Sequence, residues 1–219
     1  MDDTREKLRN LRKSIRESFA TRMLKHGFDR HSGGTFYRKT ASGRIGITLF
    51  YHDYGDSIKI EASASLRIDK AEELLFEYRT TAEVTRFGPP KKPNDFTVCE
   101  NLGNIKTGVW RQWFIYQESD VEETLDQIET LVEEVGLPFL KRLSEPELLL
   151  EEMINSTLQR SILGSPVHRF SQLFALILAL DRRDVFDEMR GFFEDRLRDN
   201  GQFRFENVVH YLDWIDSRL

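Results

Sequence analysis

The sequence predicts an α+β fold: an N-terminal helix packed on an antiparallel sheet, followed by a C-terminal antiparallel helical region. Three observations support it. Hydrophobic residues recur every second position through residues 44–68, and every third or fourth position both before this stretch and after about residue 119. The first period is typical of half-buried strands and the second of amphipathic helices. The change of period near residue 145 predicts an α+β domain at residues 1–143 and a helical appendage packed on it at residues 144–219.

Residues 4–25 are predicted to form the first helix, because an apolar stripe recurs along them with the basic residues on the opposite side. The stripe comprises Leu8, Leu11, Ile15, Phe19 and Met23. Gly27 is a natural stop after such a helix. A loop then enters a short first strand at residues 35–39.

The central hairpin is the strongest feature of the sequence. Its second strand has apolar residues at every even position from Ile58 to Ile68, and its first has them at odd positions from Ile45 to Tyr51. Residues 52–56 lie between them and are rich in turn formers. Ala62 and Ala64 are expected to face the core under a closely packed helix.

Beyond the hairpin, a helix is expected at residues 70–78 and a mobile loop at residues 88–95, which hold half of the prolines. A short edge strand is expected at residues 96–99. Residues 109–116 predict a stronger strand that is apolar on both faces, and therefore covered on both sides or flanking a groove.

Helical patterns fill the rest of the chain. Ser119 and Glu122 form a predicted capping box, and Gly136 is expected to end the helix that they open. Further helices are expected at about residues 145–160, 165–180, 184–200 and 206–217. Short connections predict that neighbouring helices pack antiparallel.

Composition limits the class of protein. Cys99 is the only cysteine, which excludes an internal disulfide and fits a reducing compartment. The first thirty residues carry charges throughout and lack the apolar segment of a signal peptide, and the longest apolar run is too short to cross a bilayer. The expected location is the cytoplasm, without membrane contact.

Charge is distributed unevenly along the chain. Residues 1–44 contain 12 Lys and Arg against 5 Asp and Glu, a net charge of +7, whereas the whole chain has a net charge of -5. One interpretation is that the basic opening binds an acidic partner, including nucleic acid. The other, which is the commoner situation, is a solvated helix face lying on an acidic body.

Two stretches resemble a bacterial domain-of-unknown-function family. Gly27-Phe28 followed by residues 35–38 is similar to its GF and FYR opening, and Trp113 with the acidic helix at 121–135 and the PFL at 138–140 is similar to its ending. The resemblance spans roughly residues 8–143. It implies a compact bacterial α+β module without an established catalytic activity, of a kind seen in stand-alone cytosolic proteins and conflict-associated genes.

Catalytic motifs are weak. No two histidines lie four residues apart, and no glycine-rich segment has phosphate-binding spacing, so the sequence predicts neither a metal site nor a cofactor. A turn histidine beside a carboxylate can act as a base, and carboxylates near a lysine superficially resemble metal-dependent nucleases. The residues of this alternative hydrolase or nuclease site are His52, Asp53, Asp56, Lys59 and Glu61.

The sequence therefore favours a non-enzymatic protein that binds another macromolecule, most simply a protein, in a bacterial immunity or defence context. Aromatic residues on the strands either form a binding platform or lie in a core under the C-terminal helices, and the second arrangement is commoner. Residues expected to bind a partner are Arg9, Arg12, Arg16, Tyr37 and Trp110. A second alternative is nucleic-acid binding through Arg5, Arg9, Arg12, Lys13 and Arg16.

Overall fold

The computed structural model describes residues 2–30, 34–81, 92, 96–158, 166–200 and 205–219. The chain divides into two compact units, Met1–Leu66 with Val98–Ser144 and Arg67–Thr97 with Glu145–Leu219. The second unit includes residues 67–97, a segment that the sequence analysis placed in the α+β part. Apart from Lys92, the predicted proline-rich loop at 88–95 lies outside the described residues.

The first unit opens with helix α1 (Asp2–Lys25), as the sequence predicts. Its apolar stripe is buried throughout. The helix ends where Gly27 takes a left-handed φ of 75° and donates to the carbonyl of Leu24, while the amide of Phe28 donates to the carbonyl of Met23. This pair of hydrogen bonds is a Schellman motif. The buried side chains of Met23 and Phe28 occupy the two positions of the hydrophobic contact that accompanies the motif.

The antiparallel sheet has the strand order β1-β2-β3-β4-β5, with β6 also pairing with β4. Its strands are β1 (Asp29–Arg30), β2 (Thr35–Lys39), β3 (Gly43–Tyr54), β4 (Ser57–Ile68), β5 (Val98–Asn101) and β6 (Trp113–Ile115). The central hairpin is confirmed, but its turn is only Gly55-Asp56, with Gly55 at a φ of 67°. Residues 52–54 belong to β3, because a two-residue loop with glycine suffices to reverse the chain.

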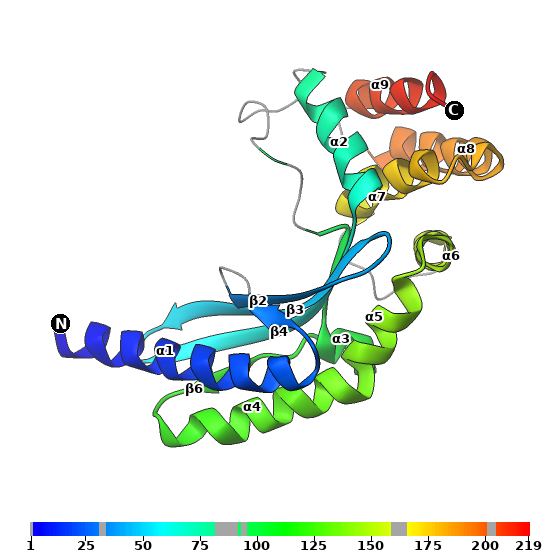
Figure 1. Ribbon diagram of the computed structural model, residues 1–219. Helices are drawn as coiled ribbons and strands as arrows, with labels where there is room; N and C mark the ends of the chain where they lie inside the picture. The colour runs from blue at the N-terminus through cyan, green and yellow to red at the C-terminus, as the bar shows by residue number, and fades with distance from the viewer. Residues whose placement is uncertain (1, 31–33, 82–91, 93–95, 159–165, 201–204) are drawn as a thin grey trace. The chain divides into compact units, whose positions relative to one another are not determined.

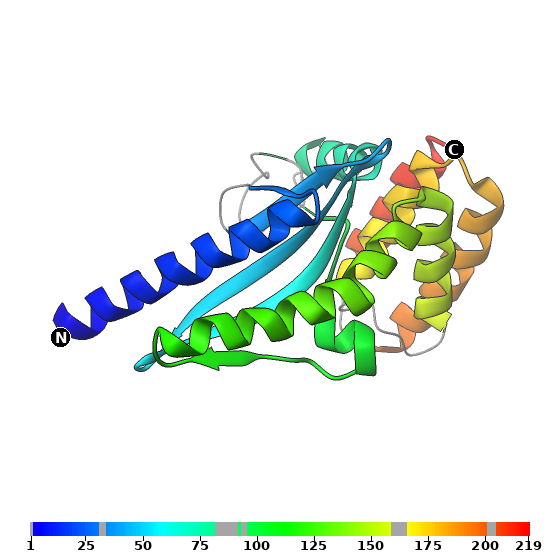
Figure 2. The ribbon, with the colours of Figure 1, turned by 60° about the horizontal axis from the view of Figure 1, so that its bottom comes forward.

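One face of the sheet packs against α1 and α4 (Ser119–Leu131), which lie side by side (Figure 2). Phe36 of β2 points to this face and makes an edge contact with Phe19 of α1, with ring centroids 5.3 Å apart. Phe36 pairs with Ile47 in the β2–β3 register, so the same face carries the alternate apolar residues of the hairpin. Tyr37 consequently points to the opposite face.

Two predictions about α4 are wrong. Glu118 occupies the N-cap position, and Ser119 makes no capping bond; Asp120 instead accepts from the amides of Tyr116 and Gln117. Gly136 does not end the helix either. It has helical dihedrals and closes a π-helical turn, η2 (Val132–Gly136), which continues into α5 (Leu137–Leu143).

The predicted strand at residues 109–116 is much shorter than expected. Helix α3 (Leu102–Thr107), which the sequence pattern did not predict, precedes it, and within residues 109–116 only the three residues of β6 pair with β4. Trp113 and Ile115 are buried, but Phe114 is 39% exposed, so β6 is covered on one side only. The aromatic density of this stretch indicated a strand but not where pairing begins.

The second unit contains α2 (Asp69–Thr81), α6 (Pro146–Leu158), α7 (Pro166–Ala179), α8 (Arg183–Asn200) and α9 (Phe205–Asp216). These helices agree with the predicted ranges. Tyr78 of α2 lies against Tyr211 and Trp214 of α9, and the Tyr211 hydroxyl donates to the carbonyl of Ser171 at 2.7 Å. Among the described residues, no helix is long and apolar enough to span a membrane.

Ala62 and Ala64 are fully buried on β4. Because Ala64 is fully buried, a phenyl ring at this position has to displace its neighbours, and Ala64→Phe is expected to lower stability by about 1 to 3 kcal/mol through overpacking. Urea unfolding followed by circular dichroism measures the change. The exposed Ala41 provides the control, since Ala41→Phe is expected to have little effect. Equal stability of Ala64→Phe and the parent chain would contradict the assignment of this face to a tightly packed core.

Candidate functional site

Helix α1 carries polar residues along two flanks of its apolar stripe. Residues four apart in an α-helix lie about 40° from each other, so Ser14, Ser18, Arg22 and His26 form one row. Arg5, Arg9, Arg12 and Arg16 form a second row at spacings of four and three, about 130° around the helix from the first. The two rows have different surroundings.

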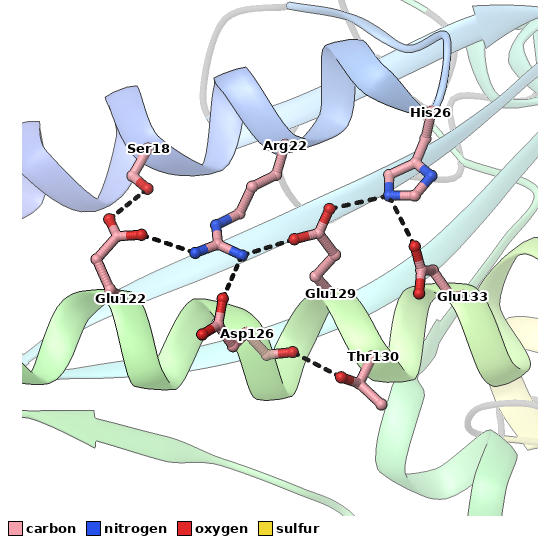
Figure 3. A network of polar contacts seen from close by, with 8 residues as sticks. All are labelled: Ser18, Arg22, His26, Glu122, Asp126, Glu129, Thr130 and Glu133. Carbon is pink, nitrogen blue, oxygen red and sulfur yellow. Dashed lines mark hydrogen bonds and ion pairs between the residues drawn. The ribbon is translucent and has the colours of Figure 1, made fainter.

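The first row contacts α4 along its length. Ser14 donates to Glu118, Ser18 donates to Glu122 at 2.6 Å, and His26 Nε2 lies 3.1 Å from Glu129 Oε1. Residue numbers rise together on both helices, so α1 and α4 run parallel. Figure 3 shows this network between the two helices.

Arg22 lies at the centre of the network. Its side chain is 11% exposed, and its guanidinium lies 2.7 Å from Glu122 Oε2, 2.6 Å from Asp126 Oδ1 and 2.6 Å from Glu129 Oε2. Burial by itself lowers the pKa of Arg22, but the hydrogen bonds to the three carboxylates outweigh burial and raise the pKa. Hydrogen bonds from Ser18 and Arg22 lower the pKa of Glu122. The acidic residues of α4 therefore neutralise this part of the basic opening.

The second row has few partners. Arg12 Nη2 lies 2.6 Å from Asp53 Oδ1. In the part of the chain that the structure describes, no ion pair or hydrogen bond holds Arg9 or Arg16 of this row, nor Lys13, which follows Arg9 by one helical turn. These side chains line a surface hollow of about 470 Å³; its lining residues are Arg9, Arg12, Lys13, Arg16 and Glu17. We call the four cations around this hollow the basic flank.

The other two residues expected to bind a partner lie elsewhere. Tyr37 is half-buried on the sheet face that points away from α1, and the Arg44 guanidinium lies 4.4 Å from its ring centroid. Trp110 is 53% exposed and lines a second hollow, of about 260 Å³, beside α3. The structure thus brings Arg9, Arg12 and Arg16 together and leaves Tyr37 and Trp110 outside their cluster.

The alternative catalytic residues do not converge. His52 and Asp53 are consecutive in β3 and point to opposite faces, so the imidazole and the carboxylate cannot orient each other. Asp53 is paired with Arg12, and Asp56 is exposed in the turn.

Farther along β4, Lys59 Nζ lies 3.0 Å from Glu61 Oε1, and Glu61 also accepts a hydrogen bond from Gln112 at 2.8 Å. Neither hollow contains any of the five proposed catalytic residues. Lys59 and Glu61 therefore form a structural ion pair.

Cys99 is a poor nucleophile in this environment. Burial raises the pKa of its thiol to about 12, and the Ser63 hydrogen bond only partly opposes that effect. Because the thiolate is the reactive form, Cys99 stays unreactive near neutral pH.

The acidic partners of α1 were not predicted from the sequence. Their signal was the spacing of Glu122, Asp126, Glu129 and Glu133, which places four carboxylates on one face of a helical segment. The row from Ser14 to His26 on α1 repeats at nearly the same spacing, so the two rows can pair along their length. The match could be seen only by comparing segments about a hundred residues apart.

No match emerges when the chain is compared with protein-family models, with curated proteins and with solved structures. The resemblance to a bacterial family of α+β modules therefore stays a prediction. The case for a function rests on the geometry of the described residues.

Proposed function

We propose that this chain is a non-enzymatic binding protein whose basic flank docks onto an acidic surface of another protein. The observation that carries the proposal is the contrast between the two rows of α1. Arg22 forms ion pairs with three carboxylates of its own chain, whereas Arg9, Lys13 and Arg16 have no such partner among the described residues. They surround a hollow in which a partner's carboxylates could be held.

The like charges of the basic flank work against the helix that carries them. Arg9 and Lys13 are four residues apart, as are Arg12 and Arg16, and each such pair destabilises a helix by about 0.2 to 0.5 kcal/mol. Simple solubility does not require this arrangement in a chain that already has 32% charged residues. An acidic partner would turn the repulsion into attraction.

An acidic protein suits the basic flank better than nucleic acid does. Packed helices lie about 8 to 10 Å apart, so the carboxylates of α4 are within about one screening length of α1 at physiological salt. Duplex DNA carries a negative charge about every 1.7 Å and extends in both directions, so it is repelled by this neighbouring acidic row. A protein surface can confine its acidic patch to the basic flank.

Fluorescence anisotropy tests the proposal with two labelled probes of equal charge, a polyglutamate peptide and a double-stranded oligonucleotide, at low ionic strength. We expect the full chain to prefer the peptide. The triple variant Arg9→Glu, Lys13→Glu, Arg16→Glu is expected to bind the peptide at least about tenfold more weakly, equivalent to about 1.4 kcal/mol. It keeps Arg12, so the pair with Asp53 is preserved.

A control variant with the same change in net charge distinguishes an effect of the basic flank from an effect of the net charge of the chain. Lys7→Glu, Lys25→Glu, Lys141→Glu alters three exposed lysines outside the hollow. We expect it to bind the peptide much better than the flank variant does. If both variants bound the peptide equally weakly, net charge alone would explain the effect, and the proposal would be overturned. Preference for the oligonucleotide, lost only in the flank variant, would replace it with nucleic-acid binding.

A further inference from the structure

We propose that His26, Glu129 and Glu133 form a binding site for a divalent transition-metal ion, with Zn²⁺ as the ion that fits them best. The three side chains each offer one ligand atom, and these atoms all lie within 4.8 Å of one another. They meet between the end of α1 and the junction of α4 with η2 (Figure 3). This site is separate from the basic flank and adds a function to the one proposed above.

The two distances from His26 are close to those that an ion between the ligands requires. His26 Nε2 lies 3.1 Å from Glu129 Oε1 and 3.6 Å from Glu133 Oε1. In a tetrahedral zinc site with ligands at about 2.1 Å, neighbouring ligand atoms are about 3.4 Å apart. These two separations lie on either side of that value, and the carboxylate oxygens lie within 4.8 Å of each other, so rotation of the Glu133 side chain toward Glu129 would complete the geometry for zinc.

Hydrogen bonding alone does not account for the arrangement. Two carboxylate oxygens approach the same imidazole nitrogen, and one N–H can donate well to only one of them. The 3.6 Å separation from Glu133 is beyond a good hydrogen bond. A metal ion bound to this nitrogen contacts both carboxylates at once.

The surrounding charges favour a cation. Glu122, Asp126, Glu129 and Glu133 carry four negative charges around the Arg22 guanidinium. The Arg38 guanidinium is the other nearby cation and donates to the backbone carbonyl of His26 at 3.4 Å, so these described groups still carry more negative than positive charge. His26 follows the last turn of α1, where the helix dipole also favours positive charge. Arg22 binds Oε2 of Glu129 and leaves Oε1 directed at His26, so the arginine fixes the orientation of a metal ligand.

The local fold holds the ligands yet leaves access. The Schellman motif at Gly27 fixes the backbone of His26, and the π-helical turn contains Glu133. The side chains of His26 and Glu129 are 15% and 17% exposed, whereas that of Glu133 is 58% exposed. Water can therefore supply a fourth ligand. An imidazole in the set favours zinc over Mg²⁺, which prefers oxygen ligands in octahedral geometry.

Isothermal titration of the full chain with ZnCl₂ tests the site, with MgCl₂ as the comparison. We expect one Zn²⁺ per chain, no comparable Mg²⁺ binding, and at least tenfold weaker Zn²⁺ binding in both His26→Gln and Glu133→Gln. Co²⁺ in place of Zn²⁺ provides a second readout, because its visible absorption reports a tetrahedral site. Circular dichroism establishes that each variant is folded.

His52→Gln and Glu134→Gln are the matched controls. His52 is an exposed histidine on the hairpin, and Glu134 adjoins Glu133 but pairs with Lys106 at 2.6 Å. Both variants are expected to bind Zn²⁺ as the parent chain does. Zn²⁺ binding that survives His26→Gln, or that falls equally in the controls, would place the ion elsewhere and overturn the proposal. Absence of Zn²⁺ binding by the parent chain would also overturn it.

Discussion

Arg22→Ala is expected to destabilise the first unit by about 2 to 3 kcal/mol at neutral pH, because it removes the cation shared by three carboxylates. Glu129, whose side chain is 17% exposed, would lose its guanidinium partner, and Glu122 and Asp126 would repel it. Urea unfolding followed by circular dichroism measures the loss. Arg16→Ala removes an arginine from the same helix without breaking a described ion pair, and is expected to change stability by less than about 0.5 kcal/mol.

The effect of Arg22→Ala depends on pH in a definite direction. Hydrogen bonds from Ser18 and Arg22 lower the pKa of Glu122 in the folded chain, so Glu122 stabilises the fold above its unfolded pKa of about 4.3. This contribution disappears as the pH falls through the lower, folded pKa. The difference between parent and variant should therefore narrow once the solution becomes more acidic than about pH 4. A constant difference down to pH 3 would argue that Arg22 acts through packing alone.

Asn101→Ala is expected to lower stability by about 3 kcal/mol. The Asn101 side chain is fully buried; its Oδ1 accepts from the amides of Gly103, Asn104 and Arg111, and its Nδ2 donates to the carbonyl of Arg111 at 3.0 Å. Alanine leaves these backbone groups without their partner, and each unsatisfied buried group costs about 1 to 3 kcal/mol. Chemical denaturation provides the measurement.

Two substitutions sharpen the Asn101 experiment. Asn10→Ala changes an exposed asparagine of α1 and is expected to be nearly neutral. Asn101→Asp keeps the acceptor that caps α3, but it replaces the donor to Arg111 with a carboxylate oxygen that faces the Arg111 carbonyl and buries a charge, so it is expected to be about as unstable as Asn101→Ala. If Asn101→Asp were much more stable than Asn101→Ala, the capping acceptor would outweigh both the lost bond to Arg111 and the buried charge.

The periodic elements of this fold could be predicted from the sequence. The central hairpin and the helices from α6 to α9 were recognised because burial of one face imposes a repeat of two or of 3.6 residues on the chain. The irregular connections could not be predicted in this way. Asn101 caps α3 through the nearby amide of Gly103, but it also binds the amide of Arg111 ten residues away, and nothing in the local pattern shows that second partner.

Helix α1 shows most clearly what the sequence by itself determined about this protein. Its period alone placed the apolar stripe inward and the basic residues outside it, because that division depends only on 3.6 residues per turn. Only the tertiary structure decided which cations are neutralised. Arg22 and His26 meet the carboxylates of α4 because two segments about a hundred residues apart pack in parallel, while Arg9, Lys13 and Arg16 lie on the other flank. Long-range pairing of this kind depends on how helices pack, which a local hydrophobic period does not encode.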